Sequence, residues 1–337
     1  MWFFELKFFF ALLLGFLITL YFLPLIIRVA IKLTIVDLPD GKLKTHARAT
    51  PYLGGLAIYI GFLAAIALVL PFENKMFHLF VGSTLLLCVG LIDDLVILSP
   101  LQKLIGQVVA TLCYLKAGFY LKELFFYNYI NIAFSALWIL TVINAFNLID
   151  VMDGLATSVA ITVAATFLLI ALLLGQPVVA LLLVAFIGAL AAFLLYNKPP
   201  AKIYLGDAGS LFIGGFLAAI PFLFGWSTWN AWGFLAPSII VGVPLVELGW
   251  LIIIRSYKKI PFYYGSRDHF SLYLQDKGWS KQAILIFAVI SSCVLSVHAL
   301  LILYNYINLL TLFLLGILFL AVWFATLFVK NTSIRRF

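Results

Sequence analysis

Eleven long apolar runs are the feature that most limits what this chain can fold into. They lie at about residues 3–27, 53–70, 77–92, 101–119, 129–146, 155–174, 177–195, 211–225, 234–255, 282–303 and 308–329. A bilayer core about 30 Å thick needs roughly 20 apolar residues per helix, and backbone groups in lipid must be bonded internally. Membrane β-strands are shorter, roughly 10 residues, and alternate in polarity. The runs therefore predict an all-α integral membrane protein, a polytopic bundle of about eleven transmembrane helices.

Composition agrees with this class. The chain has 337 residues, of which 65% are hydrophobic and 10% charged, whereas soluble domains carry roughly 25% charged residues. The first run has Glu5 and Lys7 near its start and no small-residue cleavage signal after it, so we expect a retained helix. The three cysteines lie inside apolar runs without metal-type spacing and are expected to be packing residues. Without a repeat or a linker, residues 1–337 are predicted to form a single transmembrane domain.

Positive charges are shared unequally between the two alternating sets of connections. Of the 21 Lys and Arg residues, one set holds only Lys7, Lys75, Lys116 and Lys122. The positive-inside rule places the other set in the cytoplasm, which puts the N-terminus outside and the C-terminus inside. All acidic clusters then fall on the cytoplasmic side, so we expect an active site there. The net charge of +8 reflects this topology rather than a nucleic-acid partner.

The first cytoplasmic segment, DLPDGKLKTHARATPYLGG, carries Lys44, His46 and Arg48 close to Gly54-Gly55. Basic side chains beside glycine amides at a helix entrance suit an anion. An ordinary positively charged loop is the alternative.

Asp93-Asp94 closes the third run. Adjacent carboxylates at a membrane boundary can bind a divalent cation, hold a basic residue or act on a proton, and a solvated helix end is the alternative. Because neighbouring residues point about 100° apart on a helix, we expect the two acids to have different tasks.

The segment NAFNLIDVMDGLA runs from Asn144 to Ala156. Asn144 and Asn147 share a helix face, and we expect the helix to end near Asp150, with Gly154 aiding the turn. The oxygens of Asn147, Asp150 and Asp153 suit Mg²⁺ and sugar hydroxyls, although Asn and Asp also cap helices.

The segment IYLGDAGSLFIGG places Gly206 and Asp207 just before a new helix. Free amides at a helix N-terminus suit a phosphate, and Asp207 could hold its metal. The Gly-Lys-Ser/Thr ending of a P-loop is missing.

The segment GSRDHFSLYLQDKGWS offers Arg267, Asp268 and His269 in a long cytoplasmic connection. Arg forks phosphates and His can donate to them; a local His–Asp hydrogen bond is the alternative. Acids and Asn for a metal, with Arg, Lys and His for phosphates, together indicate Mg²⁺-dependent phosphoryl transfer to a lipid.

In this order, the segments resemble the polyprenyl-phosphate N-acetylhexosamine-1-phosphate transferase superfamily over about residues 35–280. The resemblance implies transfer of a sugar-1-phosphate from a UDP-sugar to a polyprenyl phosphate in the bacterial inner (plasma) membrane, with Mg²⁺ (or Mn²⁺) and release of UMP. It places Asn147 and Asp207 at the metal, Asp150 and Asp153 near the nucleotide or metal, and Asp93 near the lipid phosphate. The predicted catalytic set is Asp93, Asp94, Asp150, Asp153 and His269. The predicted substrate-binding set is Lys44, His46, Arg48, Asn144, Gly206, Arg267 and Asp268.

The branch of the superfamily is indicated by two features. The muramoyl-pentapeptide branch has three consecutive histidines in its last inside loop and ten spans, and the bacterial N-acetylglucosamine branch typically has His-x-His-His. This chain has His269-Phe270-Ser271-Leu272 and departs from both, but eleven spans with a cytoplasmic C-terminus look more like the second. We expect UDP-N-acetylglucosamine and undecaprenyl phosphate as substrates, in cell-envelope polysaccharide synthesis. Another UDP-N-acetylhexosamine or UDP-N-acetylmuramoyl-pentapeptide is the alternative, and a homodimer stays open.

A transporter of an anionic solute is the alternative from another class. Transporters place polar groups near the membrane midplane, whereas Glu247 is the only acid clearly within a run here.

Overall fold

The eleven predicted runs all contain helix in the computed structural model, which describes residues 2–37, 50–70, 74–122, 127–226, 230–261 and 265–328. Within these ranges, eight helices are long and apolar enough to cross a membrane. A ninth crossing would be Gly233–Ile240 with Gly242–Tyr257, two helices that meet at an angle of 71°. Helices Gly54–Val69 and Pro100–Lys116 are shorter. The protein is a polytopic membrane protein, and the count of eleven crossings stays a prediction.

The chain divides into two compact units, residues 1–224 and 225–337. Each is described by itself below. The single domain predicted over residues 1–337 stays a prediction.

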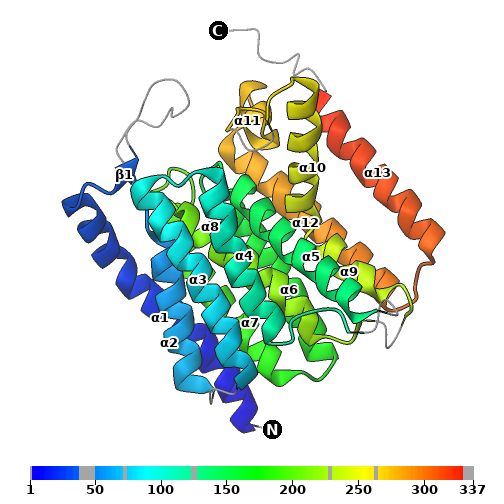
Figure 1. Ribbon diagram of the computed structural model, residues 1–337, viewed down its shortest axis with the longest axis horizontal. Coiled ribbons are helices and arrows are strands. Elements are labelled where there is room, and N and C mark those ends of the chain that lie inside the picture. Colours follow the sequence, from blue (N-terminus) through cyan, green and yellow to red (C-terminus); the bar gives the residue numbers. More distant parts are fainter. Residues whose placement is uncertain are drawn as a thin grey trace. The chain divides into compact units, whose positions relative to one another are not determined.

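In its described residues, the first unit contains helices α1 to α8 and a short β-ladder (Figure 1). Helix α1 (Trp2–Lys32) packs along α2 (Gly54–Val69) and α7 (Pro177–Asn197), and α6 (Leu155–Leu173) packs on α7. Helix α8 (Gly206–Ala219), which continues into a 3₁₀ turn at Ile220–Leu223, packs against α2, α3 (Asn74–Val96) and α5 (Asn128–Ile149). Helix α4 (Pro100–Lys116) lies between α3 and α5. Strands β1 (Val36–Asp37) and β2 (Thr50–Pro51) pair antiparallel, Val36 opposite Pro51.

Helix α8 forms the centre of this unit. Every side chain from Ala208 to Ala219 is buried, and the rings of Phe212 and Phe216 pack against Phe62 of α2 and Phe186 of α7, with Phe186 and Phe216 centroids 4.5 Å apart. A helix that is apolar all round is expected in such a core position.

Small residues allow two neighbours to approach the first turn of α8 closely. A Cβ atom added to Gly55 of α2 would lie 2.2 Å from the backbone of Gly209, and one added to Gly90 of α3 would lie 2.3 Å from the Ala208 nitrogen. These contacts leave no space for a methyl group. The N-terminus of α8, which carries Asp207, is therefore fixed against α2 and α3.

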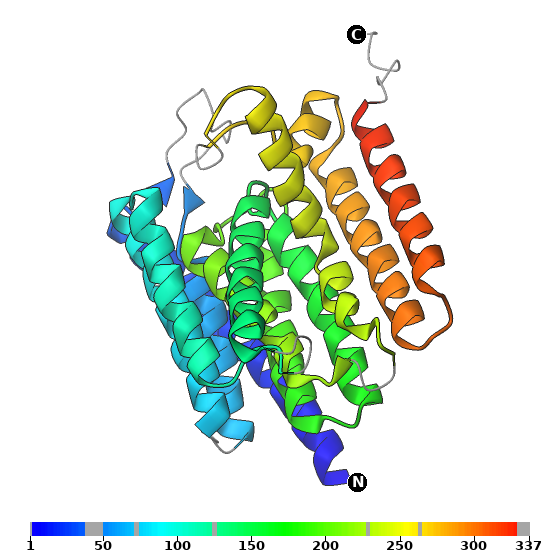
Figure 2. The same ribbon diagram turned by 45° about the vertical axis from the view of Figure 1, so that its right-hand side comes forward.

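The second unit contains a 3₁₀ turn (Gly233–Leu235), α9 (Ala236–Ile240), α10 (Gly242–Tyr257), α11 (Phe270–Asp276), α12 (Lys281–Leu303) and α13 (Leu309–Phe328). Helix α12 packs against the other four helices, and Figure 2 shows α12 and α13 side by side as an antiparallel pair. The bend between α9 and α10 precedes Pro244, which lies in the first turn of α10, where a missing N–H costs no helical hydrogen bond. Trp323 of α13 is buried against the rings of Phe270 and Phe287.

Candidate active site

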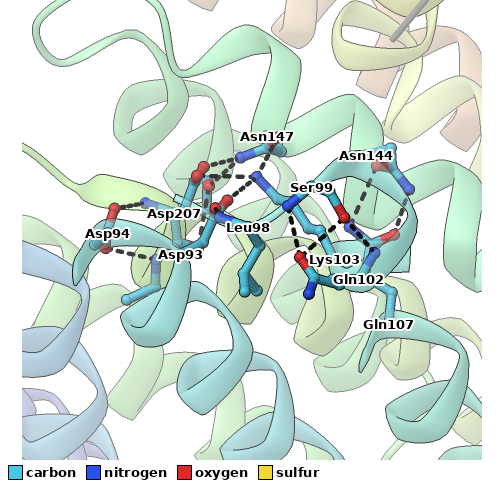
Figure 3. Close-up of polar contacts among 12 residues, drawn as sticks. Asp93, Asp94, Leu98, Ser99, Gln102, Lys103, Gln107, Asn144, Asn147 and Asp207 are labelled. Carbon is cyan, nitrogen blue, oxygen red and sulfur yellow. Dashed lines mark hydrogen bonds and ion pairs between the residues drawn. The ribbon is translucent and has the colours of Figure 1, made fainter. Parts of the chain in front are cut away.

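Four helix ends of the first unit bring the polar side chains together. They are the C-terminal ends of α3 and α5, which carry Asp93 and Asn147, and the N-terminal ends of α4 and α8, which carry Lys103 and Asp207 (Figure 3). Ser99 begins α4 with a capping box to Gln102, followed by Pro100 at the first helical position, a strong start signal. Helix N-termini favour negative charge, so two of these ends attract the carboxylates that the other elements supply.

Lys103 lies at the centre of the cluster. Its Nζ is 2.9 Å from Asp93 Oδ2 and 2.9 Å from Asp207 Oδ2, and it donates to Asn147 Oδ1 at 3.2 Å. The other oxygen of Asp93 accepts from the Leu98 amide at 2.6 Å. Three oxygens from three helices therefore face one positive charge.

Asn147 and Asp207, the predicted metal pair, are direct neighbours. The amide nitrogen of Asn147 donates to Asp207 Oδ1 and, at 2.9 Å, to Ser210 Oγ. This bonding fixes the orientation of the Asn147 side chain, so that its oxygen faces Lys103. The structure places these two residues in contact, and their role as metal ligands stays a prediction.

Asp94 has a different task from Asp93, as the 100° separation predicts. Its two oxygens accept from the Asp207 amide at 2.8 Å and the Ala208 amide at 3.1 Å. These are the amides that the sequence suggested for a phosphate, so that expectation is wrong for them. Asp94 caps α8 and holds Asp207 in place. Gly206 adopts φ +74°, and a Cβ there would lie 2.7 Å from Asp94 Oδ2, so glycine serves close packing and a left-handed turn.

Asn144 faces a neighbouring helix rather than the Lys103 cluster. Its side-chain amide exchanges two hydrogen bonds with the amide of Gln107 on α4, at 2.8 and 3.3 Å. Gln107 is almost fully buried. A paired amide bridge of this kind satisfies both polar groups in an apolar setting, and it fixes α5 against α4 one helical turn from Asn147 and Lys103.

Asp150 and Asp153 lie in the turn after α5, which ends at Ile149 as the sequence predicts. Gly154 has φ +75° and begins the next helix. Asn197 holds this turn, because its oxygen accepts from the Gly154 amide at 3.0 Å while its nitrogen donates to the Ile203 carbonyl. Asp153 accepts from the Ala201 amide at 3.3 Å. Burial, then the charges of Asp207, Asp94 and Asp153, raise the pKa of Asp150 well above its usual value.

In the second unit, Arg267, Asp268 and His269 have three separate partners. Arg267 is exposed and contacts Asp276 at 3.4 Å. Asp268 pairs with Lys258, and its carbonyl accepts from the Trp250 indole at 2.9 Å. Burial opposes ionisation of Asp268, but hydrogen bonds from Lys258 and Ser266 lower its pKa below the usual value.

His269 precedes α11 and is buried. Its Nδ1 lies 2.9 Å from Glu247 Oε1, and the other Glu247 oxygen accepts from the Phe270 amide at 3.3 Å. Glu247, an acid inside an apolar run, therefore holds the predicted catalytic histidine.

The predicted anion site of the first cytoplasmic segment is described only in part. Lys44, His46 and Arg48 lie outside the described residues. The amides of Gly54 and Gly55 donate to the carbonyls of Tyr204 and Leu205 at 3.0 and 2.9 Å. They are therefore not free for an anion, and that expectation is wrong for these two groups.

The oxygens around Lys103 suit a magnesium ion. Among the described residues no group of three or more His, Cys, Asp or Glu side chains is arranged to hold a metal. The set here is two carboxylates and one amide oxygen, and Mg²⁺ typically takes one or two carboxylates and completes its shell with water and substrate phosphates. The donors therefore fit a magnesium ion that binds together with a phosphate.

Sequence reasoning missed Lys103, which it counted only as a positive charge at a membrane boundary. A signal was present, because Lys103, Gln107 and Thr111 recur every four residues along an apolar run. This spacing places them on one helix face, and Gln107 and Thr111 are both buried.

Comparison with known proteins agrees with this site. The family described as Glycosyl transferase family 4 matches residues 76–225, which carry α3 to α8. A Bacillus subtilis protein named "Probable undecaprenyl-phosphate N-acetylglucosaminyl 1-phosphate transferase" is 30% identical over 298 residues, covering 86% of this chain and 83% of its own. Proteins named phospho-N-acetylmuramoyl-pentapeptide-transferase from Bacillus thuringiensis and Bacillus cereus are each 32% identical over 241 residues, covering 62% of this chain and 72% of their own.

The length of the first match, together with the family match across the helices that build the cluster, establishes the relationship. The chain belongs to the polyprenyl-phosphate N-acetylhexosamine-1-phosphate transferase superfamily and is a sugar-phosphate transferase of membranes.

Proposed function

We propose that this enzyme transfers N-acetylglucosamine-1-phosphate from UDP-N-acetylglucosamine to undecaprenyl phosphate and releases UMP. The reaction would take place at the cytoplasmic face of a bacterial inner membrane, as the first membrane step of cell-envelope polysaccharide synthesis. The observation that carries the proposal is the convergence of Asp93, Asn147 and Asp207 oxygens on one cation at a set of helix ends. The name of the Bacillus subtilis relative supports the choice of sugar and lipid.

In the proposed reaction, an oxygen of the lipid phosphate attacks the sugar-bearing phosphorus, and the bond from that phosphorus to the UMP oxygen breaks. Mg²⁺, held by Asn147 and Asp207, would supply charge neutralisation on the phosphates. The second pKa of a phosphate monoester is near 6, so the lipid phosphate is mostly dianionic at pH 7 and needs no strong base. Asp93, fixed by Lys103 and the Leu98 amide, suits orientation of the lipid phosphate or removal of a residual proton.

A covalent route is the alternative mechanism, in which an aspartate first displaces UMP and then passes the phospho-sugar to the lipid. The two routes differ in what happens with UDP-sugar alone. Labelled protein after incubation without lipid would support the covalent route, and unlabelled protein in an active preparation would exclude it.

UMP release by purified protein, given undecaprenyl phosphate, Mg²⁺ and a panel of UDP-sugars, tests the proposal. UMP only with UDP-N-acetylglucosamine is the expected result. Release with UDP-N-acetylmuramoyl-pentapeptide would instead favour the activity that the Bacillus cereus relatives' name states. Folded protein that releases UMP from no donor would contradict the proposal.

Asp207→Asn is expected to lose most turnover, roughly 10²-fold or more, as for other groups that stabilise transition-state charge. The variant should stay folded, because the Asp94 cap on the α8 amides does not use the Asp207 side chain. Glu73→Gln, which neutralises a carboxylate two residues before Lys75 in a connection predicted to lie outside, is a matched control. Near-normal turnover of Asp207→Asn would contradict a role for Asp207 as a metal ligand.

A further inference from the structure

The Lys103 ammonium stands at the one point on which the proposed metal ligands converge. Its distances are 2.9 Å to Asp207 Oδ2, 3.2 Å to Asn147 Oδ1 and 2.9 Å to Asp93 Oδ2. The lysine side chain is 17% exposed and the Asp93 side chain 10%. One ammonium therefore offsets one of the two negative charges, in a partly buried place where the Asp207 side chain is 32% exposed.

An ammonium and a magnesium ion cannot occupy the same point among these oxygens. Mg²⁺ binds oxygen at roughly 2.0–2.1 Å, well inside the distances that Lys103 keeps. Two cations that close to the same atoms repel each other strongly in a partly buried site. One of them has to leave, and the lysine has a flexible four-carbon stem with which to do so.

We propose that Lys103 is an exchangeable counter-cation: it pairs with Asp93 and Asp207 before the metal binds, and its ammonium leaves Asn147 and Asp207 when the divalent cation enters. This inference rests on the magnesium site of the proposed function. The displaced ammonium remains beside Asp93, where it can contact a phosphate oxygen of the bound substrate. Part of the negative charge of the site is thus offset in both states.

The contrasting role is a permanent ion pair that builds the metal site. The two roles predict opposite effects of removing the charge. If Lys103 competes with the metal, its removal strengthens metal binding. If Lys103 supports the ligands, its removal misplaces Asp207 and weakens metal binding.

Binding of Mn²⁺ to the purified full-length protein without substrate, measured by electron paramagnetic resonance, separates these roles. Lys103→Met keeps the length of the stem and removes the charge, and it should bind Mn²⁺ at least tenfold more tightly than the original protein. Lys103→Arg keeps the charge and should bind close to the original affinity. Lys116→Met, an exposed lysine in the last turn of the same helix, should change nothing. Unchanged or weaker binding by folded Lys103→Met would overturn the exchange.

The same titration distinguishes failure of the inference from failure of the metal site. Binding by the original protein that Asp207→Asn abolishes, with no gain in Lys103→Met, would overturn the exchange alone. No Mn²⁺ binding by any folded variant would overturn the magnesium site and the exchange together.

A measurement on the unchanged protein covers the case in which Lys103→Met does not fold. Amine acylation of Lys103, followed by mass spectrometry, should become several-fold faster when Mg²⁺ is added, because the ammonium leaves Asp207 and Asn147. Acylation of Lys116 should not change. Equal or slower acylation of Lys103 with Mg²⁺ would contradict the exchange.

Discussion

Asp150 is a carboxyl group in unfavourable surroundings. Burial and the nearby charges of Asp207, Asp94 and Asp153 raise its pKa, so its ionised form destabilises the folded protein relative to an unfolded chain, where Asp has a pKa of about 3.9. This cost is absent below about pH 4 and grows as the pH rises toward the folded-state pKa. Asp150→Asn should therefore raise the Tm of the metal-free protein at pH 7, by a few degrees.

The gain should shrink toward zero near pH 4, which thermal unfolding in EDTA at several pH values would show. A gain that does not depend on pH would mean that packing, rather than charge, explains it. Because the family resemblance predicts Asp150 near the nucleotide or metal, the same variant should lose activity while gaining stability, a common trade at functional sites.

Candidate site residues with strong chemical preferences could be identified from the sequence, but most of the partners that they contact could not. Asn147 and Asp207 stand out as oxygen donors at helix ends, and the structure places them together. In the sequence alone, Lys103 looks like any lysine at a membrane boundary, and Glu247 looks like any acid inside an apolar helix. Lys103 contacts Asn147, which is 44 residues away in the sequence, and Glu247 contacts His269, which is 22 residues away. A single sequence does not specify such contacts.

At the scale of the helices, the first turn of α8 depends on the absence of side chains on its neighbours. Gly55→Ala would place a methyl group 2.2 Å from the Gly209 backbone, and overpacking of this kind typically costs about 1–3 kcal/mol. We expect a lower Tm and, because Asp207 begins α8, a lower turnover. Gly316→Ala on α13 meets no atom within 4 Å and should be neutral or stabilising. Equal behaviour of the two variants would contradict the close α2–α8 contact.

Helix positions were largely predictable because hydropathy is a strong signal over 20 residues. The positions of the helix ends were less predictable. The third run was predicted to end at residue 92, but α3 continues to Val96, because the Asp93 and Asp94 side chains find partners that let polar residues stay in the helix. The bend of 71° between α9 and α10 was also missed, since residues 234–255 were predicted as one run.

For the whole molecule, the distribution of Lys and Arg predicts an outer N-terminus and a cytoplasmic C-terminus. Gln282 in the first turn of α12 and Tyr306 just after its end are both exposed, and they give a direct test in a background without the three cysteines. Tyr306→Cys should react with a membrane-impermeant maleimide in intact cells, and Gln282→Cys only after the membrane is opened. The reverse pattern would contradict the orientation.

The long-range cap formed by Asp94 has a consequence for how the protein is made. Asp93 and Lys103 are separated by one short connection, so the first ion pair can form once α3 and α4 have been synthesised. Asp94 and the α8 amides lie 113 residues apart, and synthesis proceeds from the N-terminus. Until the ribosome has delivered α8, the nascent chain carries Asp94 without its cap contacts. The site is therefore complete only when helices made early and helices made late lie at matching depths in the bilayer.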